Sequence, residues 1–529
     1  MNFEKMWISD NSDGTYTNPI LYTDYSDPDM IRVGDDYFMI ASSFCNSPAI
    51  PLLHSKDMVN WKVINYVLDH IPGDRFFNPE HGCGVWAPAI RYHNNTFYVC
   101  FPMPDEGLFM CTATDPFGKF SEPVCIKPGK GYIDPCPFWD DDGKAYLVHA
   151  FARSRIGFKS IIHLNEMSPD GMSVIGEGIH IFDGNETQPT IEGPKMYKKN
   201  GYYYIFAPAG GVKTGWQTVL RSKNVWGPYE EKIVMRQGSS DVNGPHQGAY
   251  VTDTNGKDWF LHFQDVYACG RIIHLQPMTW KNDWPIIGIA KDDNDFGEPV
   301  TTYNKPTNIT TTPYCPDDSD DFSSDTLGLQ WQWNCNYDKS WYDTDKDNKQ
   351  LILYPIYQDK DTALADTKNL LLQKWTAPSF TATATLDVSA LDKNDYAGFV
   401  SLGVVFGGLG VRKNDSNYDI ISIRGSQTFK NEKATSTQEV TIIDTVDTIS
   451  TIYIRYTVTQ TAIIDYRPSE NITFEYSLDG INYHKAGNDI EAVAGRWVGV
   501  KCGLFCYNPT NTNSLGKLYA KSFVFSKNK

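Results

Sequence analysis

One phrase recurs five times in the first 265 residues, and this repeat constrains the fold more than any other feature of the chain. In each copy an acid or other polar residue near a Pro leads into an apolar stretch, and an aromatic-rich strand follows after a turn. The copies begin at Asp27, Ala87, Asp134, Glu192 and His246. Their starts lie roughly 50 to 60 residues apart, which is the period of propeller blades rather than of shorter solenoid repeats. The sequence therefore predicts an all-β protein that begins with a five-bladed β-propeller.

Short turn sequences recur at the same place in every copy, before the aromatic strand. They occupy residues 33–36, 93–95, 140–143, 198–201 and 254–256, and each is rich in Gly, Asn or Asp. Such residues join antiparallel strands in tight hairpins. Helical periodicity is nearly absent over this stretch, so an all-β propeller is the consistent interpretation.

The composition changes between residues 291 and 322, where Asp, Asn, Thr and Pro dominate. This change is typical of a linker. Strand-like patterns resume beyond it, for example the alternating apolar positions Phe380, Ala382, Ala384 and Leu386. We therefore expect a propeller over residues 1–300, a linker over 301–318, and a second all-β domain over 319–529, either a sandwich or a jelly roll.

The charge balance argues against several classes of partner. The 64 Asp and Glu residues outnumber the 47 Lys and Arg residues, which gives a formal net charge of −17. Such a surface repels nucleic acid and anionic membranes, and it suits a neutral ligand. No apolar run reaches about 18 residues, so a transmembrane helix is not expected. The sequence leaves open whether the chain forms a homo-oligomer.

The cysteines and the first residues bear on the compartment. The eleven cysteines are scattered and include no Cys-x-x-Cys pair, which predicts neither a disulfide framework nor a structural zinc site. The stretch from Met1 to Trp7 lacks the apolar core and cleavage site of a secretory signal. Both features predict a cytoplasmic protein.

Three of the five repeats bring a carboxyl group to the same place. The innermost strand of every blade faces the propeller axis, so Asp27, Asp134 and Glu192 are expected to converge in one cavity. Two carboxyl groups that flank a glycosidic bond can hydrolyse it, one as acid and one as base or nucleophile. A third negative charge nearby helps the acid to stay protonated near neutral pH. The sequence therefore predicts a glycosidase.

Several segments resemble glycoside hydrolase family 43. In the first domain they are residues 25–29, 84–88, 133–143, 191–194, 244–248 and 270–278, and in the second 320–322, 331–334 and 497–505. The second set is similar to the concanavalin-like sandwich attached to many β-xylosidases of that family. Together the segments cover nearly all of the chain. The resemblance implies an enzyme that acts on oligosaccharides derived from hemicellulose.

The resemblance also implies a role for each axial carboxyl group. Asp27 corresponds to the general base that activates water, and Glu192 to the general acid that protonates the leaving oxygen. Asp134 corresponds to the residue that orients Glu192 and tunes its acidity. Because the family inverts the anomeric centre, we expect the carboxyl groups of Asp27 and Glu192 to stand roughly 6.5–9.5 Å apart, with the water between them.

Further positions follow from the same resemblance. Phe44 and Trp86 are expected to wall the subsite of the terminal sugar, and Arg271 to reach substrate hydroxyls and the base. Trp216 is expected on a loop at the mouth, on the leaving-group side. In many relatives the equivalent of His246 touches a water or a hydrated calcium ion. The chemistry needs no cofactor, while a Ca²⁺ ion on the axis near His246 is left open.

These inferences favour an exo-acting, inverting hydrolase that releases terminal β-D-xylosyl residues from xylo-oligosaccharides, alone or together with arabinofuranosidase activity. The main alternative is an α-L-arabinofuranosidase that trims hemicellulose side chains, because the two sugars present similar hydroxyl patterns. A fructan hydrolase ranks low, because Ser26-Asp27-Pro28-Asp29 replaces the Asn-Asp-Pro-Asn-Gly of those enzymes. A non-catalytic sugar-binding propeller is disfavoured because all three carboxyl groups are present.

Overall fold

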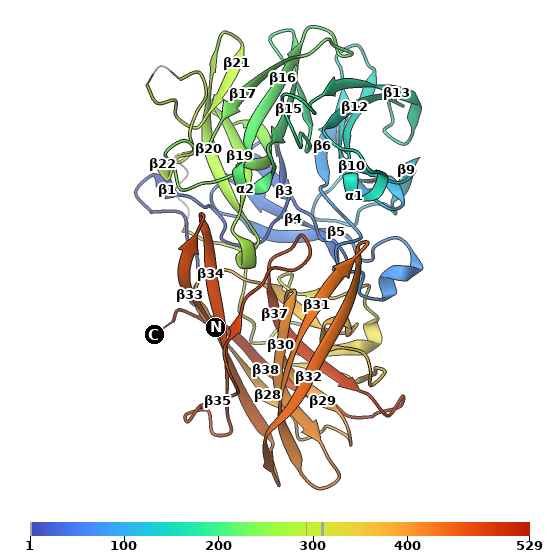
Figure 1. The fold of residues 1–529 in the computed structure, drawn as a ribbon, viewed down its shortest axis with the longest axis vertical. Coiled ribbons are helices and arrows are strands. Elements are labelled where there is room, and N and C mark those ends of the chain that lie inside the picture. Colours follow the sequence, from blue (N-terminus) through green and yellow to red (C-terminus); the bar gives the residue numbers. More distant parts are fainter. Residues whose placement is uncertain (1–2, 293, 308–311, 529) are drawn as a thin grey trace.

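The computed structural model of the protein describes residues 3–292, 294–307 and 312–528. It contains two β-rich domains stacked end to end along the long axis of the molecule (Figure 1). The first consists of five four-stranded sheets, and the second of two eight-stranded sheets. The predicted propeller followed by a sandwich is thereby confirmed.

The five propeller sheets each run in sequence order from the innermost to the outermost strand. Blade 1 comprises β2 (Asp29–Val33), β3 (Asp36–Ile40), β4 (Ala49–Ser55) and β5 (Lys62–Leu68). Blade 2 comprises β6 (Ala89–His93), β7 (Thr96–Met103), β8 (Gly107–Ala113) and β9 (Val124–Pro128). Blade 3 comprises β10 (Tyr132–Trp139), β11 (Ala145–Phe151), β12 (Ile161–Met167) and β13 (Val174–Asp183). Blade 4 comprises β14 (Lys195–Lys199), β15 (Tyr202–Ala209), β16 (Trp216–Ser222) and β17 (Glu230–Met235). Blade 5 comprises β18 (His246–Thr252), β19 (Asp258–Asp265), β20 (Arg271–Lys281) and β21 (Trp284–Ile287).

The recurring turns are the hairpins that join the first two strands of the blades. In blade 2, His93 pairs with Thr96 across the two-residue loop Asn94-Asn95, and both asparagines have positive φ, 47° and 58°. That backbone is the type I′ turn, whose twist matches the flanking strands and which Asn tolerates well. The turn chemistry thus joins the first strand of the blade to the aromatic strand that pairs with it.

An N-terminal segment closes the ring of blades. Strand β1 (Thr15–Thr17) pairs with β22 (Thr302–Asn304), which follows the last blade. The Asn18 side chain donates to the carbonyls of Leu275 and Val300, at 2.8 and 2.9 Å, and accepts from the Leu275 amide at 2.9 Å. The start of the propeller is therefore fastened to its fifth blade by a short sheet and a buried side chain. We call this arrangement, β1, β22 and Asn18, the N-terminal staple.

The second domain is a sandwich of two sheets. The first sheet has the order β23 (Gln332–Trp333), β27 (Leu371–Lys374), β37 (Lys501–Asn508), β29 (Tyr396–Leu402), β30 (Val405–Lys413), β31 (Tyr418–Lys430) and β32 (Lys433–Val446), and β26 (Ile356–Tyr357) pairs with β37. The second has the order β24 (Tyr342–Asp345), β25 (Gln350–Leu353), β38 (Leu518–Ser526), β28 (Phe380–Asp387), β33 (Thr451–Ile464), β34 (Arg467–Ser477) and β35 (His484–Lys485), and β36 (Ile490–Glu491) pairs with β34.

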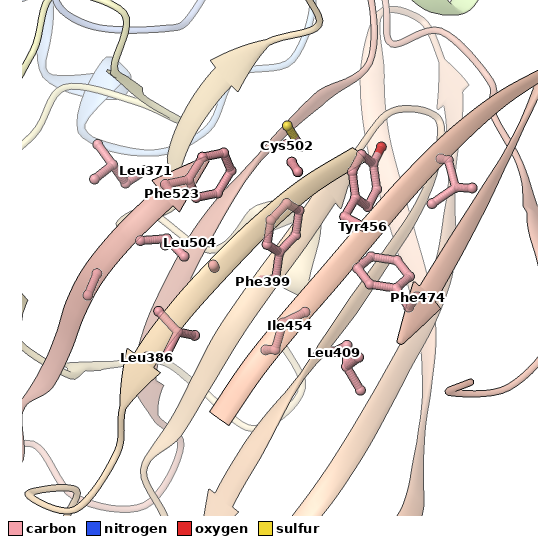
Figure 2. Packing of buried hydrophobic residues seen from close by; sticks show 14 of the residues in the cluster. Leu371, Leu386, Phe399, Leu409, Ile454, Tyr456, Phe474, Cys502, Leu504 and Phe523 are labelled. Atoms are coloured by element: carbon pink, nitrogen blue, oxygen red, sulfur yellow. The ribbon is translucent and has the colours of Figure 1, made fainter. Parts of the chain in front are cut away.

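The sandwich core follows the alternation seen in the sequence. In β28 the side chains of Phe380, Ala382, Ala384 and Leu386 are fully buried, while the threonines between them are half-buried. Figure 2 shows part of this core, in which Phe399 lies between residues of several strands, Tyr456 and Phe523 among them. Phe399 stacks on both of these rings, with centroids 5.0 and 5.1 Å away.

The two domains share one hydrophobic core. Ala268 and Ile272 of the propeller belong to the same buried cluster as Trp333 and Trp375 of the sandwich. The backbones of Ser47 and Trp333 also pair, with N–O distances of 3.2 and 2.6 Å. The domain interface is therefore built like a protein interior.

Helices are short and few among the described residues: α1 (Arg153–Ile156), α2 (Gly211–Thr214), η1 (Asp74–Phe77), η2 (Tyr267–Cys269), η3 (Lys339–Trp341) and η4 (Leu364–Asp366). Within the described ranges, none of them has the length and apolar character needed to span a membrane. The eleven cysteines all lie within these ranges and are free thiols.

Candidate active site

One cavity on the propeller axis brings the three predicted carboxyl groups together. Its volume is ≈ 120 Å³. For comparison, an engineered protein cavity of roughly 150 Å³ binds a benzene ring, so this one matches a single sugar ring in size. The lining residues come from all five blades and from the sandwich: Asp27, Phe44, Trp86, Ala87, Ile133, Asp134, Glu192, Val212, His246, Gln247, Arg271 and Trp497.

The backbone at the repeat position is unusual in the same way in two blades. Asp27 and Asp134 have φ values of 55° and 56°, which non-glycine residues seldom adopt. A bulge between Ile133 and Cys136 interrupts the pairing of β10 around Asp134. Backbone strain of this kind costs about 1–3 kcal/mol per residue and clusters at functional sites. The blades hold these carboxyl groups in place at the expense of regular strand geometry.

Asp27 is surrounded by hydrogen-bond donors. The hydroxyls of Ser26 and Ser42 each donate to Asp27 Oδ2 at 2.7 Å. Arg271 Nη1 donates to Asp27 Oδ1 at 2.8 Å and to Ser26 Oγ at 2.7 Å. Asp27 therefore accepts three hydrogen bonds, one at Oδ1 and two at Oδ2.

Glu192 has a more open environment. It lies before β14 and is followed by Gly193, whose φ is +61°. Its side chain keeps 28% of its exposure, and its Oε1 atom is 2.9 Å from His246 Nε2. His246 is 2% exposed, and its Nδ1 atom is buried without a hydrogen-bond partner in the protein. One oxygen of Glu192 is thereby fixed by His246.

Asp134 is the buried member of the group. It is 4% exposed, and its Oδ2 atom accepts a hydrogen bond of 2.8 Å from the Gly193 amide, next to Glu192. Burial raises the pKa of Asp134 to about 7, and the negative charges of Glu192 and Asp27 raise it as well. The positive charge of Lys195 acts in the opposite direction. The cavity therefore holds a carboxyl group that exchanges its proton near neutral pH.

Aromatic rings form the wall of the cavity. Phe44 and Trp86 lie with ring centroids 6.1 Å apart, and both line the cavity as expected. Trp497 of the sandwich meets Trp86 edge to face, with centroids 6.2 Å apart. Trp497 lies in a segment that carries the family resemblance, but the resemblance implied no role for it. No periodicity within the sandwich signals that one of its loops reaches the propeller axis.

Trp216, expected on a loop at the mouth, is not among the residues that line the cavity. It is the first residue of β16, and its indole donates to Gln188 Oε1 at 2.8 Å. The guanidinium of Arg236 covers the ring, 5.1 Å from its centroid. Val212 of the same glycine-rich loop contributes to the lining instead, as does Gln247 beside His246.

The propeller axis is filled beneath the cavity. Asp29, two residues further along the chain than Asp27, is fully buried and pairs with Arg91 of β6 at 2.7 Å. Cys136 and Lys195, from β10 and β14, are also buried. We refer to Asp29, Arg91, Cys136 and Lys195 as the axial plug. Further along, the same innermost strands line a second cavity of ≈ 510 Å³, so the buried side chains of the axial plug lie between two separate cavities.

The residues around His246 do not supply a calcium site of their own. Calcium prefers six to eight oxygen ligands, whereas the Nε2 atom of His246 contacts Glu192. Within the described part of the chain, no group of three or more His, Cys, Asp or Glu residues has the arrangement of a metal site.

A propeller with three carboxyl groups around a cavity of one-ring size defines a class of protein, the glycoside hydrolases. The pattern of glycosyl hydrolases family 43 matches residues 16–285. The pattern of the beta xylosidase C-terminal concanavalin A-like domain matches residues 319–525. The chain belongs to glycosyl hydrolases family 43, as its sequence segments indicated.

Individual relatives align with this chain over most of its length. It is 34% identical to the beta-xylosidase of Formosa agariphila, covering 94% of this chain and 88% of that one. It is 30% identical to the non-reducing end alpha-L-arabinofuranosidase BoGH43B of Bacteroides ovatus, covering 79% and 78%. The crystal structure of the GH43 BlXynB protein from Bacillus licheniformis superposes with a TM-score of 0.78 at 26% identity, covering 97% of this chain and 100% of that one.

Proposed function

We propose that this glycoside hydrolase is an inverting, exo-acting β-xylosidase that removes terminal β-D-xylosyl units from xylo-oligosaccharides. The observation that carries the proposal is the cavity itself, which has room for one ring, is lined by three carboxyl groups and lies above the axial plug. A cavity of this shape accepts the end of a chain and excludes its interior. The net charge of −17 suits a neutral substrate of this kind.

The partners of each carboxyl group support its role. Asp27, which accepts hydrogen bonds from Ser26, Ser42 and Arg271, takes a proton from water, and the oxygen of that water bonds to the anomeric carbon. Glu192 gives its proton to the glycosidic oxygen as the bond to the leaving sugar breaks. Asp134, whose Oδ2 atom accepts from the Gly193 amide, fixes the backbone beside the acid.

Two observations favour xylose over arabinofuranose. The second domain matches a pattern named for beta xylosidases, and the relative from Formosa agariphila is a beta-xylosidase. The relative from Bacteroides ovatus is an arabinofuranosidase, so side-chain trimming is the second candidate activity. The two sugars differ in ring size but offer similar hydroxyls to the same carboxyl groups.

The deciding experiment compares matched aryl β-D-xyloside and aryl α-L-arabinofuranoside, using wild type and Asp27→Ala. We expect faster hydrolysis of the xyloside and its loss in the variant, with α-xylose as the first product seen by proton NMR. Faster hydrolysis of the arabinofuranoside would assign the second activity. Release of β-xylose first would contradict inversion.

We also propose that hydrolysis needs no metal ion, because carboxyl groups supply both proton transfers and the Nε2 atom of His246 contacts Glu192. Treatment with a chelator is expected to leave kcat/KM unchanged. A loss that calcium restores would instead place the ion on the axis near His246.

A further inference from the structure

The tip of the β31–β32 hairpin carries a glutamate in an unfavourable backbone conformation. Lys430 pairs with Lys433, so Asn431 and Glu432 form a two-residue loop, and their φ values are 50° and 64°. This is the type I′ geometry, in which the second central position strongly favours glycine. A glutamate there costs conformational energy, which contacts of its side chain can offset. Glu432 makes such contacts.

Glu432 lies between two arginines from different parts of the molecule. Arg496 Nη2 is 2.8 Å from Oε1 and 2.9 Å from Oε2 of Glu432. Arg155 Nη1, from α1 of blade 3, is 3.6 Å from Glu432 Oε2. In Figure 1 the β31–β32 hairpin rises from the sandwich toward α1. One carboxylate therefore joins a hairpin tip, a loop of the sandwich and a propeller blade.

Each arginine lies over one tryptophan of the cavity wall. The guanidinium of Arg496 is 4.3 Å from the Trp497 ring centroid, and that of Arg155 is 5.2 Å from the Trp86 ring centroid. The two indoles meet edge to face. Trp497 itself has a φ of 67°, so it too depends on its contacts to keep its conformation.

Trp497 separates two cavities. Besides the catalytic cavity, it lines a neighbouring one of ≈ 270 Å³ between the domains. Tyr267, Phe429 and Arg467 line that second cavity, and Val212 and Arg271 border both. Because the two cavities share these lining residues, the second has room for the next sugar of an oligosaccharide bound in the first.

We propose that Glu432 is a positioning residue of this enzyme: by clamping Arg496 it holds Trp497 at the boundary between the sugar cavity and the leaving-group side. The inference rests on the proposed hydrolysis of xylo-oligosaccharides. Without the carboxylate, the guanidinium groups of Arg155 and Arg496 face each other with no shared counter-charge. Arg155 keeps its bond of 3.0 Å to Asp105, so Arg496 and Trp497 move.

The test uses Glu432→Gln, with Glu475→Gln as a matched control. Glu475 pairs with Arg455 elsewhere in the sandwich and is 27% exposed, against 24% for Glu432. We expect Glu432→Gln to raise KM for xylotriose at least fivefold, with kcat within twofold of wild type. Glu432→Asp should restore part of the affinity, and the control should match wild type. An unchanged KM, with or without a fall in kcat, would overturn the proposal.

A double-mutant cycle separates action through Trp497 from a general loss of structure. If Glu432 acts by placing Trp497, then adding Glu432→Gln to Trp497→Ala should change KM less than twofold. Fully additive effects would contradict the proposal. Should Glu432→Gln fail to fold, Arg496→Lys, which keeps the charge but loses the two-pronged contact, takes its place with the same expected result.

Failure of the proposed function gives a different result. Wild type would then cleave neither xylotriose nor an aryl xyloside. The link between Glu432 and Trp497 would still be measured by near-UV circular dichroism. Glu432→Gln is expected to reproduce part of the spectral change of Trp497→Ala, and a spectrum identical to wild type would overturn the link.

Discussion

At the scale of single residues, Asp27 and Glu192 differ in the neighbours that surround them. Asp27 accepts hydrogen bonds from two hydroxyls at Oδ2 and from a guanidinium at Oδ1. Glu192 is held at one oxygen by His246 and keeps 28% of its exposure. Asp27 is thus held by three donors, whereas Glu192 keeps part of its side chain open to a substrate.

Glu192→Gln tests this difference. An amide cannot protonate the glycosidic oxygen, so kcat for xylobiose is expected to fall by about 10²–10⁴-fold. The acidic phenol of an activated aryl xyloside departs without protonation, so kcat for that substrate should fall much less. Turnover of both substrates is measured side by side, and equal losses would contradict the assignment of Glu192 as the acid.

Asp134→Asn tests the buried carboxyl group through stability. The pKa of Asp134 rises from 3.8 to about 7 in the folded protein. Below pH 4 both states hold the proton, but between about 4 and 7 only the unfolded state loses it, so stability falls as pH rises. Asp134→Asn has no carboxyl group at this position, so its stability does not fall for this reason over that pH range. Its unfolding midpoint should exceed that of wild type at pH 8 by several degrees, with the difference shrinking toward pH 4.

At pH 8 Asp134→Asn should be less active than wild type although it is more stable. The amide removes a negative charge beside Glu192, so the basic limb of the pH–rate profile is expected to move to lower pH. If the basic limb stays at the pH found for wild type, Asp134 does not influence the proton used in the reaction.

At the scale of elements, the N-terminal staple is the part of the propeller with the clearest energetic role. Asn18→Ala removes three hydrogen bonds and leaves the Leu275 amide and two carbonyls without that partner. We expect a loss of about 2–3 kcal/mol and a lower midpoint of thermal unfolding. Asn11→Ala, whose bonds to Thr15 and Thr17 are exposed, is the control and should leave the midpoint unchanged.

The elements also show what could be predicted from the sequence. Asp27, Asp134 and Glu192 were expected together because blades repeat, and equivalent positions of a repeat must face the same axis. Trp216 does not join them in the lining of the cavity, because its indole is bonded to Gln188. Trp497 was missed because its position depends on how two domains pack, which the local pattern of either domain does not encode.

At the scale of the whole molecule, the sandwich acts as part of the propeller's support. Ala268 and Ile272 share a buried cluster with Trp333, and the Gly499 amide donates to Asp24 Oδ2 at 2.8 Å. Separating the domains would expose this apolar surface to water. Loss of the second domain would therefore leave apolar surface of the propeller uncovered.

Calorimetry of the full chain should accordingly show one unfolding transition, and a fragment ending at residue 318 should be insoluble or inactive. Two well-resolved transitions, or an active and soluble fragment, would show that the propeller stands alone. Reductant should not alter the transition, because the eleven cysteines are free.

The axial plug imposes an order on the departure of products. Once the bond is cut, the released monosaccharide lies between the axial plug and the leaving group. The monosaccharide can therefore leave only after the leaving group has dissociated. The last product to dissociate binds the same free enzyme as the substrate. Xylose should thus inhibit competitively, whereas the aryl alcohol released from an aryl xyloside should not, and product-inhibition kinetics distinguish the two patterns.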